Sequence, residues 1–177
     1  MNEDGTVDVA DISTVIDIMA GKQIVDENAY ACCPNESHPH WIDLGLSSGT
    51  LWQCCNEGAS KPEGYGSYYK FDEAQAYNPP TLDQSRELLD KCTSVWTTLN
   101  GVNGRKFTGP SGGSIFLPAA GMRIDDKLDD VRQWGYYWSS TPFDENHASY
   151  FKFYWEFTYW YNDGNCNKDG LSVRPVR

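Results

Sequence analysis

The sequence predicts an α+β fold with small antiparallel sheets, one or two helices and long loops. From Trp41 onward, short apolar runs alternate with turns rich in Gly, Pro, Asn and Asp, which is typical of antiparallel hairpins. After Pro80, one segment combines a helix start signal with apolar residues at helical spacing. Near the end of the chain, aromatic residues alternate with other residues as they do in a β-strand.

Composition and charge limit the classes of protein. The 177 residues suffice for one domain and a short additional element, and the 14% of aromatic residues predicts a core rich in rings. The net charge of −11 argues against nucleic acid or an anionic membrane as a partner, because both attract clustered Lys and Arg. No apolar run approaches the ~18 residues of a membrane-spanning helix, so no transmembrane segment is expected. The first residues also lack the apolar stretch of a signal peptide.

The N-terminal segment has the carboxylate spacing of a calcium loop. Asn2, Asp4, Asp8 and Asp11 fit ligand positions 3, 5, 9 and 12, whereas the carboxylate of position 1 is absent. An amphipathic helix follows, so residues 1–21 resemble one repeat of a dockerin, the module that docks secreted enzymes onto cohesins. A dockerin has two such repeats, and cohesin docking is therefore not expected. The alternatives are a weak Ca²⁺ site and a helix that merely precedes the main domain.

Residues 22–40 are expected to form a polar connector, in which His38 and His40 are solvent-exposed rather than metal ligands. Two vicinal cysteine pairs lack the two-residue spacer of a zinc knuckle, so a structural zinc is not expected. An even number of cysteines instead favours some disulfides and an oxidising compartment, and hence an extracellular or cell-surface location. The cysteines are Cys32, Cys33, Cys54, Cys55, Cys92 and Cys166.

The main domain is expected to span residues 41–177 and to open with a hairpin. Trp41–Trp52 contains two short apolar strands around a Ser-Ser-Gly turn. Further along, Thr81 and Gln84 have the spacing of a capping box, which predicts the start of a helix.

A second hairpin is expected from the strands 106–108 and 115–117, because Gly109–Ser114 between them is a glycine-rich loop. That loop lacks the Lys-Ser/Thr pair and the following helix of a phosphate-binding loop. The four aspartates between residues 125 and 130 are expected to lie in a solvated acidic loop.

The chain is organised around its aromatic end. Thirteen of its 25 aromatic residues lie between Tyr136 and Tyr161. Aromatic residues occupy alternate positions from Phe151 to Tyr161, so an unbroken strand would place six rings on one face. Since each ring removes roughly 150–250 Å² from water, burying both faces of so long a strand is difficult. Either the segment bends back as a hairpin or several rings stay exposed.

Exposed rings in one patch usually mark a binding surface, and the alternative is an aromatic core. The polar loop 162–170 and a closing strand, 171–177, follow the rings. An aromatic strand, a polar loop and a terminal strand together predict a binding face carried by a scaffold.

Four motifs follow one another in the main domain: Trp41–Trp52, Gly109-Pro110 with Ile115–Gly121, Tyr136–Pro142 and Ser172–Arg177. Together they resemble the Fibrobacter succinogenes major paralogous domain, a family common in surface proteins of gut anaerobes. The resemblance covers about residues 40–177 and implies the fold of C-type lectins and formylglycine-generating enzymes. This C-type-lectin-like fold is preceded here by the short dockerin-like helix. The family pattern also implies a disulfide between Cys55 and Cys92.

The C-terminal segment is also similar to the variable proteins of diversity-generating retroelements, which use this lectin-like fold. Adenine-directed mutagenesis of an Asn codon yields Phe, Tyr, Ser, Asp, His, Cys or Gly among others, but never Lys, Glu, Gln, Met or Trp. The reachable types are dense between Phe143 and Asp169, and Cys166 in its Asn-Asp-Gly loop fits a mutated Asn codon. The resemblance therefore implies that this segment is diversified.

These features predict a non-enzymatic, surface or secreted ligand-binding domain of the receptor or adhesin kind. Its ligand is expected to be a protein or a glycan, and the alternative function is a carbohydrate-binding lectin-like module. No Ser-His-Asp set, metal triad or poised carboxylate pair is recognisable, so neither catalysis nor a cofactor other than Ca²⁺ is expected. The residues expected to face the ligand are Tyr154, Phe157, Tyr159, Trp160, Tyr161, Asn162, Asp163, Asn165, Asn167 and Asp169.

Overall fold

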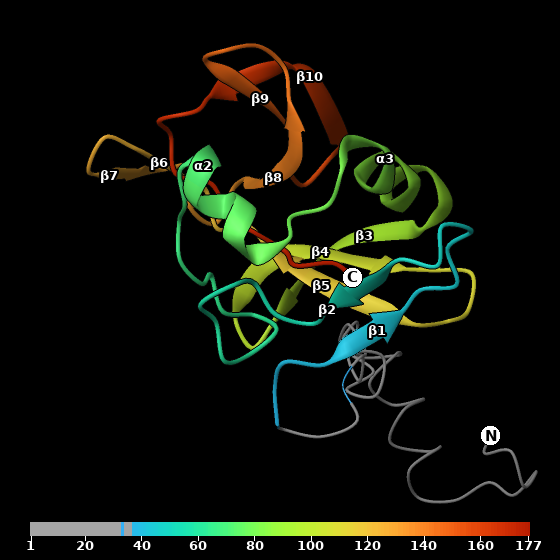
Figure 1. The fold of residues 1–177 in the computed structure, drawn as a ribbon. Coiled ribbons are helices and arrows are strands. Elements are labelled where there is room, and N and C mark those ends of the chain that lie inside the picture. The colour runs from blue at the N-terminus through green and yellow to red at the C-terminus, as the bar shows by residue number, and fades with distance from the viewer. Residues whose placement is uncertain (1–32, 34–36) are drawn as a thin grey trace, which may run out of the picture. The chain divides into compact units, whose positions relative to one another are not determined.

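The computed structural model describes residue 33 and residues 37–177, with the side chains of all of these except 160–166. All described residues belong to one compact unit, Cys32–Arg177, so residues 37–40 are part of the domain rather than of a separate connector. Two short helices and several small antiparallel sheets make an α+β fold that is mostly β (Figure 1). The predicted fold class is confirmed at this level.

The first hairpin forms as predicted. β1 (Trp41–Asp43) and β2 (Leu51–Gln53) pair antiparallel. On its other side β2 meets the C-terminal segment, because Leu51 and Arg177 exchange backbone hydrogen bonds of 2.9 and 3.1 Å. The beginning and the end of the domain are therefore held together at β2.

Along the chain, the helical segment comes between β2 and the first strand of the next sheet. α2 (Phe71–Ala74) continues into the 3-10 turn η2 (Gln75–Tyr77), and α3 (Leu82–Lys91) follows. The predicted capping box is confirmed: Thr81 Oγ1 accepts from the Gln84 N–H at 3.2 Å, and Gln84 Oε1 accepts from the Thr81 N–H at 2.8 Å. The buried residues of α3 are Leu82, Ser85 and Leu88.

The middle sheet has the order β3-β4-β5 and contains the second predicted hairpin. It consists of β3 (Thr93–Leu99), β4 (Val102–Thr108) and β5 (Ser114–Pro118), and β5 is buried along its whole length. A Cβ at Gly104 would collide with the backbone carbonyl of Leu117. Glycine therefore allows β4 and β5 to approach at this point.

The acidic segment folds as a hairpin, not as the solvated loop that was expected. β6 (Met122–Ile124) and β7 (Lys127–Asp129) pair antiparallel. β7 has only three residues, all of them exposed, so it is too short for an alternation of apolar and polar residues to signal a strand. Asp130 then accepts a hydrogen bond of 2.6 Å from the hydroxyl of Tyr136, which gives one of the four aspartates a structural role.

The aromatic end forms a third sheet with the order β10-β9-β8, seen at the top of Figure 1. Its strands are β8 (Gly135–Pro142), β9 (His147–Phe153) and β10 (Thr158–Cys166). The segment therefore bends back as a hairpin after Phe153, which is one of the two alternatives that the sequence left open. The register of β10 on β9 shifts between Tyr161 and Asn165.

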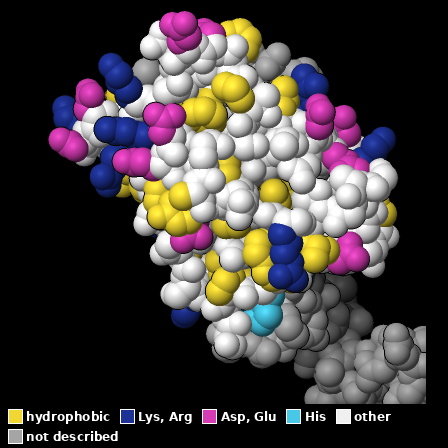
Figure 2. All heavy atoms as spheres, in the orientation of Figure 1, with side chains coloured by type: hydrophobic (Ala, Val, Ile, Leu, Met, Phe, Trp, Pro, Cys, Tyr) yellow, Lys and Arg dark blue, Asp and Glu magenta, His cyan; other side chains and the backbone are white. Residues whose placement is uncertain are grey.

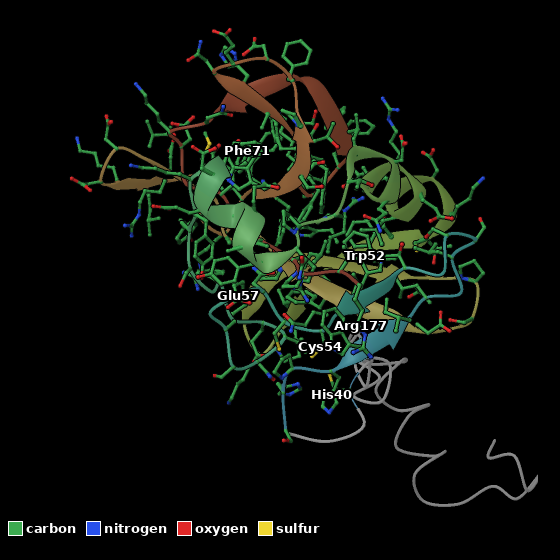
Figure 3. All side chains as sticks on the ribbon, in the orientation of Figure 1. His40, Trp52, Cys54, Glu57, Phe71 and Arg177 are labelled. Atoms are coloured by element: carbon green, nitrogen blue, oxygen red, sulfur yellow. The ribbon has the colours of Figure 1, made fainter. Side chains whose placement is uncertain are left out.

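Two hydrophobic clusters fill the domain. The larger joins the β1-β2 hairpin and α3 to the middle sheet and the inner face of the third sheet. The smaller lies between α2 and the third sheet, where the ring of Phe71 meets that of Trp138 edge-on at 5.6 Å. Figure 3 labels Phe71, from α2 beneath the third sheet, and Trp52, from β2, one in each cluster.

Residues 171–177 close the fold without forming the regular strand that was expected; they make isolated bridges to separate segments. Arg174 is completely buried, and its Nε–H donates to Asn56 Oδ1 at 3.0 Å. Its two terminal nitrogens donate to the carbonyls of Gln53 (2.9 Å) and Phe116 (2.8 Å). One guanidinium thus ties the C-terminal segment to β2 and β5.

The disulfide implied between Cys55 and Cys92 is not formed in the structure. Both thiols are buried in the larger cluster. The Cys55 sulfur lies 3.5 Å from that of Cys54, well beyond the ~2.05 Å of a disulfide bond. Burial, with a smaller contribution from Glu87, raises the pKa of the Cys92 thiol to about 11. Both residues serve here as small apolar core residues.

The surface is mixed in charge. Figure 2 shows acidic and basic side chains interleaved over the face drawn, with hydrophobic side chains in small groups among them. None of the helices in the part of the chain that the structure describes is long and apolar enough to span a membrane.

Candidate functional site

The turn between β9 and β10 presents large rings on a fixed backbone. The Tyr154 N–H donates to the Phe157 carbonyl at 3.0 Å and closes the turn. From β4, the nearly buried Arg105 donates through Nη2 to the carbonyl of Trp155 at 3.3 Å. The Trp155 and Phe157 side chains nevertheless remain 65% and 48% exposed. The backbone of the turn is therefore attached to the middle sheet while its rings face solvent.

Alternation along β9 separates an inner from an outer face. Phe151 and Phe153 are completely buried and stack on Tyr137, with ring centroids 5.2 and 5.9 Å apart. Beyond Phe153 the chain turns. In an unbroken strand Trp155, two residues further on, would lie on the same face as Phe153, but here its side chain is exposed. The rings that one long strand would have aligned are thus divided between core and surface.

The outer face carries a row of five stacked rings, here called the aromatic row. Successive ring centroids lie 6.3, 6.1, 4.4 and 6.2 Å apart, with angles between ring planes of 11 to 28°. These separations are close to the range of about 4.5–7 Å in which aromatic pairs attract one another. The row is, in order, Tyr150, Tyr136, Trp134, Tyr154 and Tyr159.

The aromatic row runs from the interior to solvent. Tyr136 and Tyr150 are buried, Trp134 and Tyr154 are partly exposed, and Tyr159 is exposed. The buried end is held by the fold, so the exposed rings stand on a supported base. Such an arrangement limits the side-chain freedom that a ligand would otherwise have to freeze.

Two further rings widen the exposed end of the row. Phe157 lies 5.9 Å from both Tyr154 and Tyr159, and Trp155 meets Tyr154 edge-on at 6.2 Å. Together these rings form one surface, here called the aromatic face. It consists of Trp134, Tyr154, Trp155, Phe157 and Tyr159.

Charged and hydroxyl groups border the aromatic face. The Lys152 ammonium lies 5.1 Å from the ring centroid of Trp134 and 5.8 Å from that of Tyr136, within the range of cation–π attraction. Burial and then Asp130 raise the pKa of Tyr136 far above its ordinary value. Desolvation, with Tyr159 and Glu156, raises the pKa of Tyr154 to about 12. Both hydroxyls are therefore neutral at physiological pH.

Three of the residues expected to face the ligand lie on the aromatic face, namely Tyr154, Phe157 and Tyr159. Five others have their backbone in β10, but their side chains lie outside the described part of the chain; they are Trp160, Tyr161, Asn162, Asp163 and Asn165. The predicted calcium ligands also lie outside the described residues; they are Asn2, Asp4, Asp8 and Asp11.

Asn167 and Asp169, which were also expected to face the ligand, are partly exposed. The Asn167 N–H donates to the Asn146 carbonyl at 2.8 Å, and its own carbonyl accepts from the Phe71 N–H at 3.1 Å. Burial and then the charge of Asp125 raise the pKa of Asp169. The backbone of Asn167 thus joins the β8-β9 turn to α2.

Three residues of the site were not among those expected to face the ligand, namely Trp134, Trp155 and Arg105. The register pairs Gly135 with Phe153, so Trp134 and Tyr154 come next to each other just beyond the ends of β8 and β9. Had the pairing of β8 with β9 been known from the sequence, it would have identified Trp134 as the neighbour of Tyr154. No feature of the sequence indicated that Arg105 reaches the turn.

A second cluster of reactive side chains lies beside β1. The Nδ1 atoms of His38 and His40 are 3.4 and 3.9 Å from the sulfur of Cys54. The ligand atoms of these three residues and Cys33 all lie within 4.8 Å of one another. The prediction that His38 and His40 are exposed linker residues is therefore wrong, since both are partly buried against the domain. Figure 3 shows His40 close to Cys54.

The remaining histidine stabilises a turn. His147 Nδ1 lies 2.8 and 2.9 Å from the two carboxylate oxygens of Asp144, and both side chains are exposed. Asp144 Oδ1 also accepts from the backbone N–H groups of Asn146 and His147. This geometry is that of an aspartate closing the β8-β9 turn.

Comparison of the chain with protein-family models, with characterised proteins and with solved structures found no match. The arrangement described above offers a surface for contact with a ligand. Its exposed rings provide apolar contact area, and its hydroxyl and charged groups provide hydrogen bonds at the border.

Proposed function

We propose that this is a non-enzymatic ligand-binding domain of the receptor or adhesin kind, carried by a surface or secreted protein. Its binding surface is the aromatic face together with the adjoining strand β10. The observation that carries the proposal is the exposure of Trp155 (65%) and Phe157 (48%) on a turn that Arg105 anchors. Exposed rings on a fixed backbone offer large contact area and lose little conformational entropy when a ligand binds.

A protein is the ligand that fits this surface best. Trp and Tyr dominate the energetic centres of protein interfaces, and polar or charged residues surround such centres. Here the rings are bordered by Lys152 on one strand and by Glu156 within the turn, where Tyr154 Oη donates to Glu156 at 3.3 Å. An apolar centre with a charged border is the pattern of a protein interface.

A glycan is the second candidate, and the exposure of Trp155 favours it. An exposed Trp ring offers a flat apolar face on which a sugar ring can stack. The same binding experiment separates the two candidates.

We further propose that the α+β arrangement is C-type-lectin-like and that the segment from Phe143 to Asp169 is diversified. The order of the four motifs supports the first statement, and the density of adenine-reachable residues supports the second. The position of β10 at the edge of its sheet also supports diversification, because substitutions on an edge strand disturb fewer neighbours. Sequencing this locus in sibling strains tests the idea: changes confined to that segment support it, and changes spread evenly over the domain refute it.

The binding experiment compares three proteins. The face variant carries Trp155→Ala, Phe157→Ala and Tyr159→Ala. The control variant carries Val95→Ala and Leu128→Ala, which remove side chains that are 63% and 50% exposed on other strands. Each protein is applied to an array of extracellular proteins and to a glycan array, with and without a chelator.

We expect wild type and the control variant to bind the same array protein with the same affinity. The face variant should lose affinity on the order of thirtyfold or more, because truncating one central interface residue costs about 2 kcal/mol or more. Binding of wild type to glycans alone would favour the lectin-like alternative. A face variant that binds as tightly as the control would refute the assignment of this surface.

A further inference from the structure

We propose that Cys33, His38, His40 and Cys54 form a structural zinc site that fastens the segment before β1 to the end of β2. Two thiol sulfurs and two imidazole nitrogens lie within 4.8 Å of one another. Sulfur and nitrogen ligands select Zn²⁺, whereas Ca²⁺ and Mg²⁺ require oxygen ligands. This site is therefore separate from the calcium loop expected at the N-terminus.

The measured separations suit a tetrahedral zinc ion. Bond lengths of about 2.3 Å to sulfur and about 2.0–2.1 Å to nitrogen place a sulfur and a nitrogen ligand about 3.5–3.6 Å apart. The Cys54 sulfur is 3.4 Å from the Nδ1 atom of His38 and 3.9 Å from that of His40. These values lie on either side of the ideal separation, so shifts of a few tenths of an ångström would bring these three ligands into place, and the ligand atom of Cys33 lies within 4.8 Å of them.

The backbone positions two of the ligands before any metal binds. The Cys54 N–H donates to the His40 carbonyl at 2.9 Å, which places the two residues opposite each other at the end of the β1-β2 hairpin. In return, the His40 N–H donates to the Cys54 sulfur at 3.0 Å. A backbone N–H directed at a ligand sulfur stabilises the negative charge that the sulfur carries when it binds zinc. The ring of His38 meets that of His40 edge-on at 5.2 Å.

The site is closed, which favours a structural over a catalytic role. Cys54 is completely buried, and Cys33, His38 and His40 are partly buried. Four protein ligands leave no coordination position for a substrate. Cys33 also packs against the larger core cluster, so zinc would join the segment that precedes β1 to the core. A disulfide between Cys33 and Cys54 would explain why these two sulfurs are close together. It would not explain why the imidazole rings of His38 and His40 also lie next to Cys54.

The test uses the full chain, purified without a polyhistidine tag, reduced and freed of metal. It is titrated with Co²⁺, whose visible spectrum reports the geometry and the ligand type, and then with Zn²⁺. We expect one Co²⁺ per chain, tetrahedral d–d bands and a thiolate-to-cobalt charge-transfer band. Zn²⁺ should displace the cobalt while excess Ca²⁺ should not, and the bound metal should raise the melting temperature. An octahedral spectrum, or no saturable binding, overturns the proposal.

Variants identify the ligands. Cys54→Ser and His40→Ala are expected to abolish the tetrahedral spectrum, whereas Cys55→Ala and Cys92→Ala should retain it. A Cys54→Ser protein with an unchanged spectrum refutes the assignment. If that variant does not fold, the wild-type spectrum and His38→Ala, at a partly buried position, decide the question: loss of the tetrahedral spectrum in His38→Ala supports the assignment, and an unchanged spectrum refutes it. Peptide mapping adds an independent outcome: a disulfide at Cys54 in a chain isolated with zinc present overturns the proposal.

Discussion

Phe153 and Trp155 offer a direct test of where the aromatic end leaves the core. The two residues have the same parity in the sequence and would share one face of an unbroken strand. In the structure Phe153 is completely buried, whereas Trp155 is 65% exposed, because the hairpin turns between them. Replacing each by Ala should therefore change the free energy of unfolding by different amounts.

The difference can be worked out from the contacts. The Phe153 ring lies 6.4, 6.2 and 5.9 Å from those of Trp96, Phe107 and Tyr137. Truncating a ring in such a place costs about 3–5 kcal/mol. Only about a third of the ~200 Å² of Trp155 is covered, which at ~25 cal/mol per Å² limits its loss to about 2 kcal/mol. The usual value for a surface substitution is within about 0.5 kcal/mol.

Urea unfolding followed by far-ultraviolet circular dichroism measures both losses without relying on tryptophan fluorescence. We expect equal m-values and a midpoint for Phe153→Ala well below that of Trp155→Ala, with a gap of at least about 1–2 kcal/mol. Equal losses for the two variants would show that Trp155 belongs to the core, and the aromatic face would not exist as a binding surface.

Three further measurements check other parts of the structure. Arg174→Met should lower the free energy of unfolding by at least about 3 kcal/mol in urea titrations, because it leaves the buried acceptors of its hydrogen bonds unpaired; a loss below 1 kcal/mol would contradict the buried geometry. The folded-state pKa of Tyr136 is raised above its unfolded value of about 10, so its contribution to stability is complete below about pH 10 and is lost as the pH rises beyond it. Tyr136→Phe should therefore flatten the fall of the urea midpoint between pH 9.5 and 11, and an unchanged slope would count against the burial of its hydroxyl and its bond to Asp130. Because burial raises the pKa of Cys92 to about 11, iodoacetamide should label it only after unfolding, as mass spectrometry can determine; labelling of the native protein would show that the thiol is accessible.

Elements with local signals could be predicted from the sequence. The spacing of Thr81 and Gln84 defines a capping box, and the helix begins there. The glycine-rich loop 109–114 marks the turn between β4 and β5. β6 and β7 could not be predicted, because each has only three residues, most of them exposed, and so short an alternation is no reliable signal of a strand.

The turning point of the aromatic end depends on distant residues. Aromatic alternation continues through residues 154–157 without a Gly, Pro or Asn to mark a turn. The turn is instead held by Arg105, which precedes Trp155 by 50 positions. A contact of that separation leaves no local trace in the sequence. The sequence could therefore present a hairpin only as one of two alternatives.

The cluster at Cys54 was missed for a different reason. Spacing rules for zinc compare cysteines and histidines that are neighbours along the chain, and the vicinal pairs fail those rules. The relevant neighbours lie across the hairpin. Once Trp41 is paired with Gln53, extending the register by one residue places His40 opposite Cys54. The predicted hairpin thus implied that His40 and Cys54 are neighbours, but this could be read only once the register of the two strands was known.

The hydrogen bonds of Arg174 connect residues that are 58 to 121 positions apart in the chain. Val176 likewise belongs to the same core cluster as Trp52. During synthesis, β1, β2 and the middle sheet are therefore available long before the segment that completes their packing. Contacts of such separation are slow to form, since the loops between them must close first. We expect the domain to acquire its native fold only after residue 177 has left the ribosome, in a single late step.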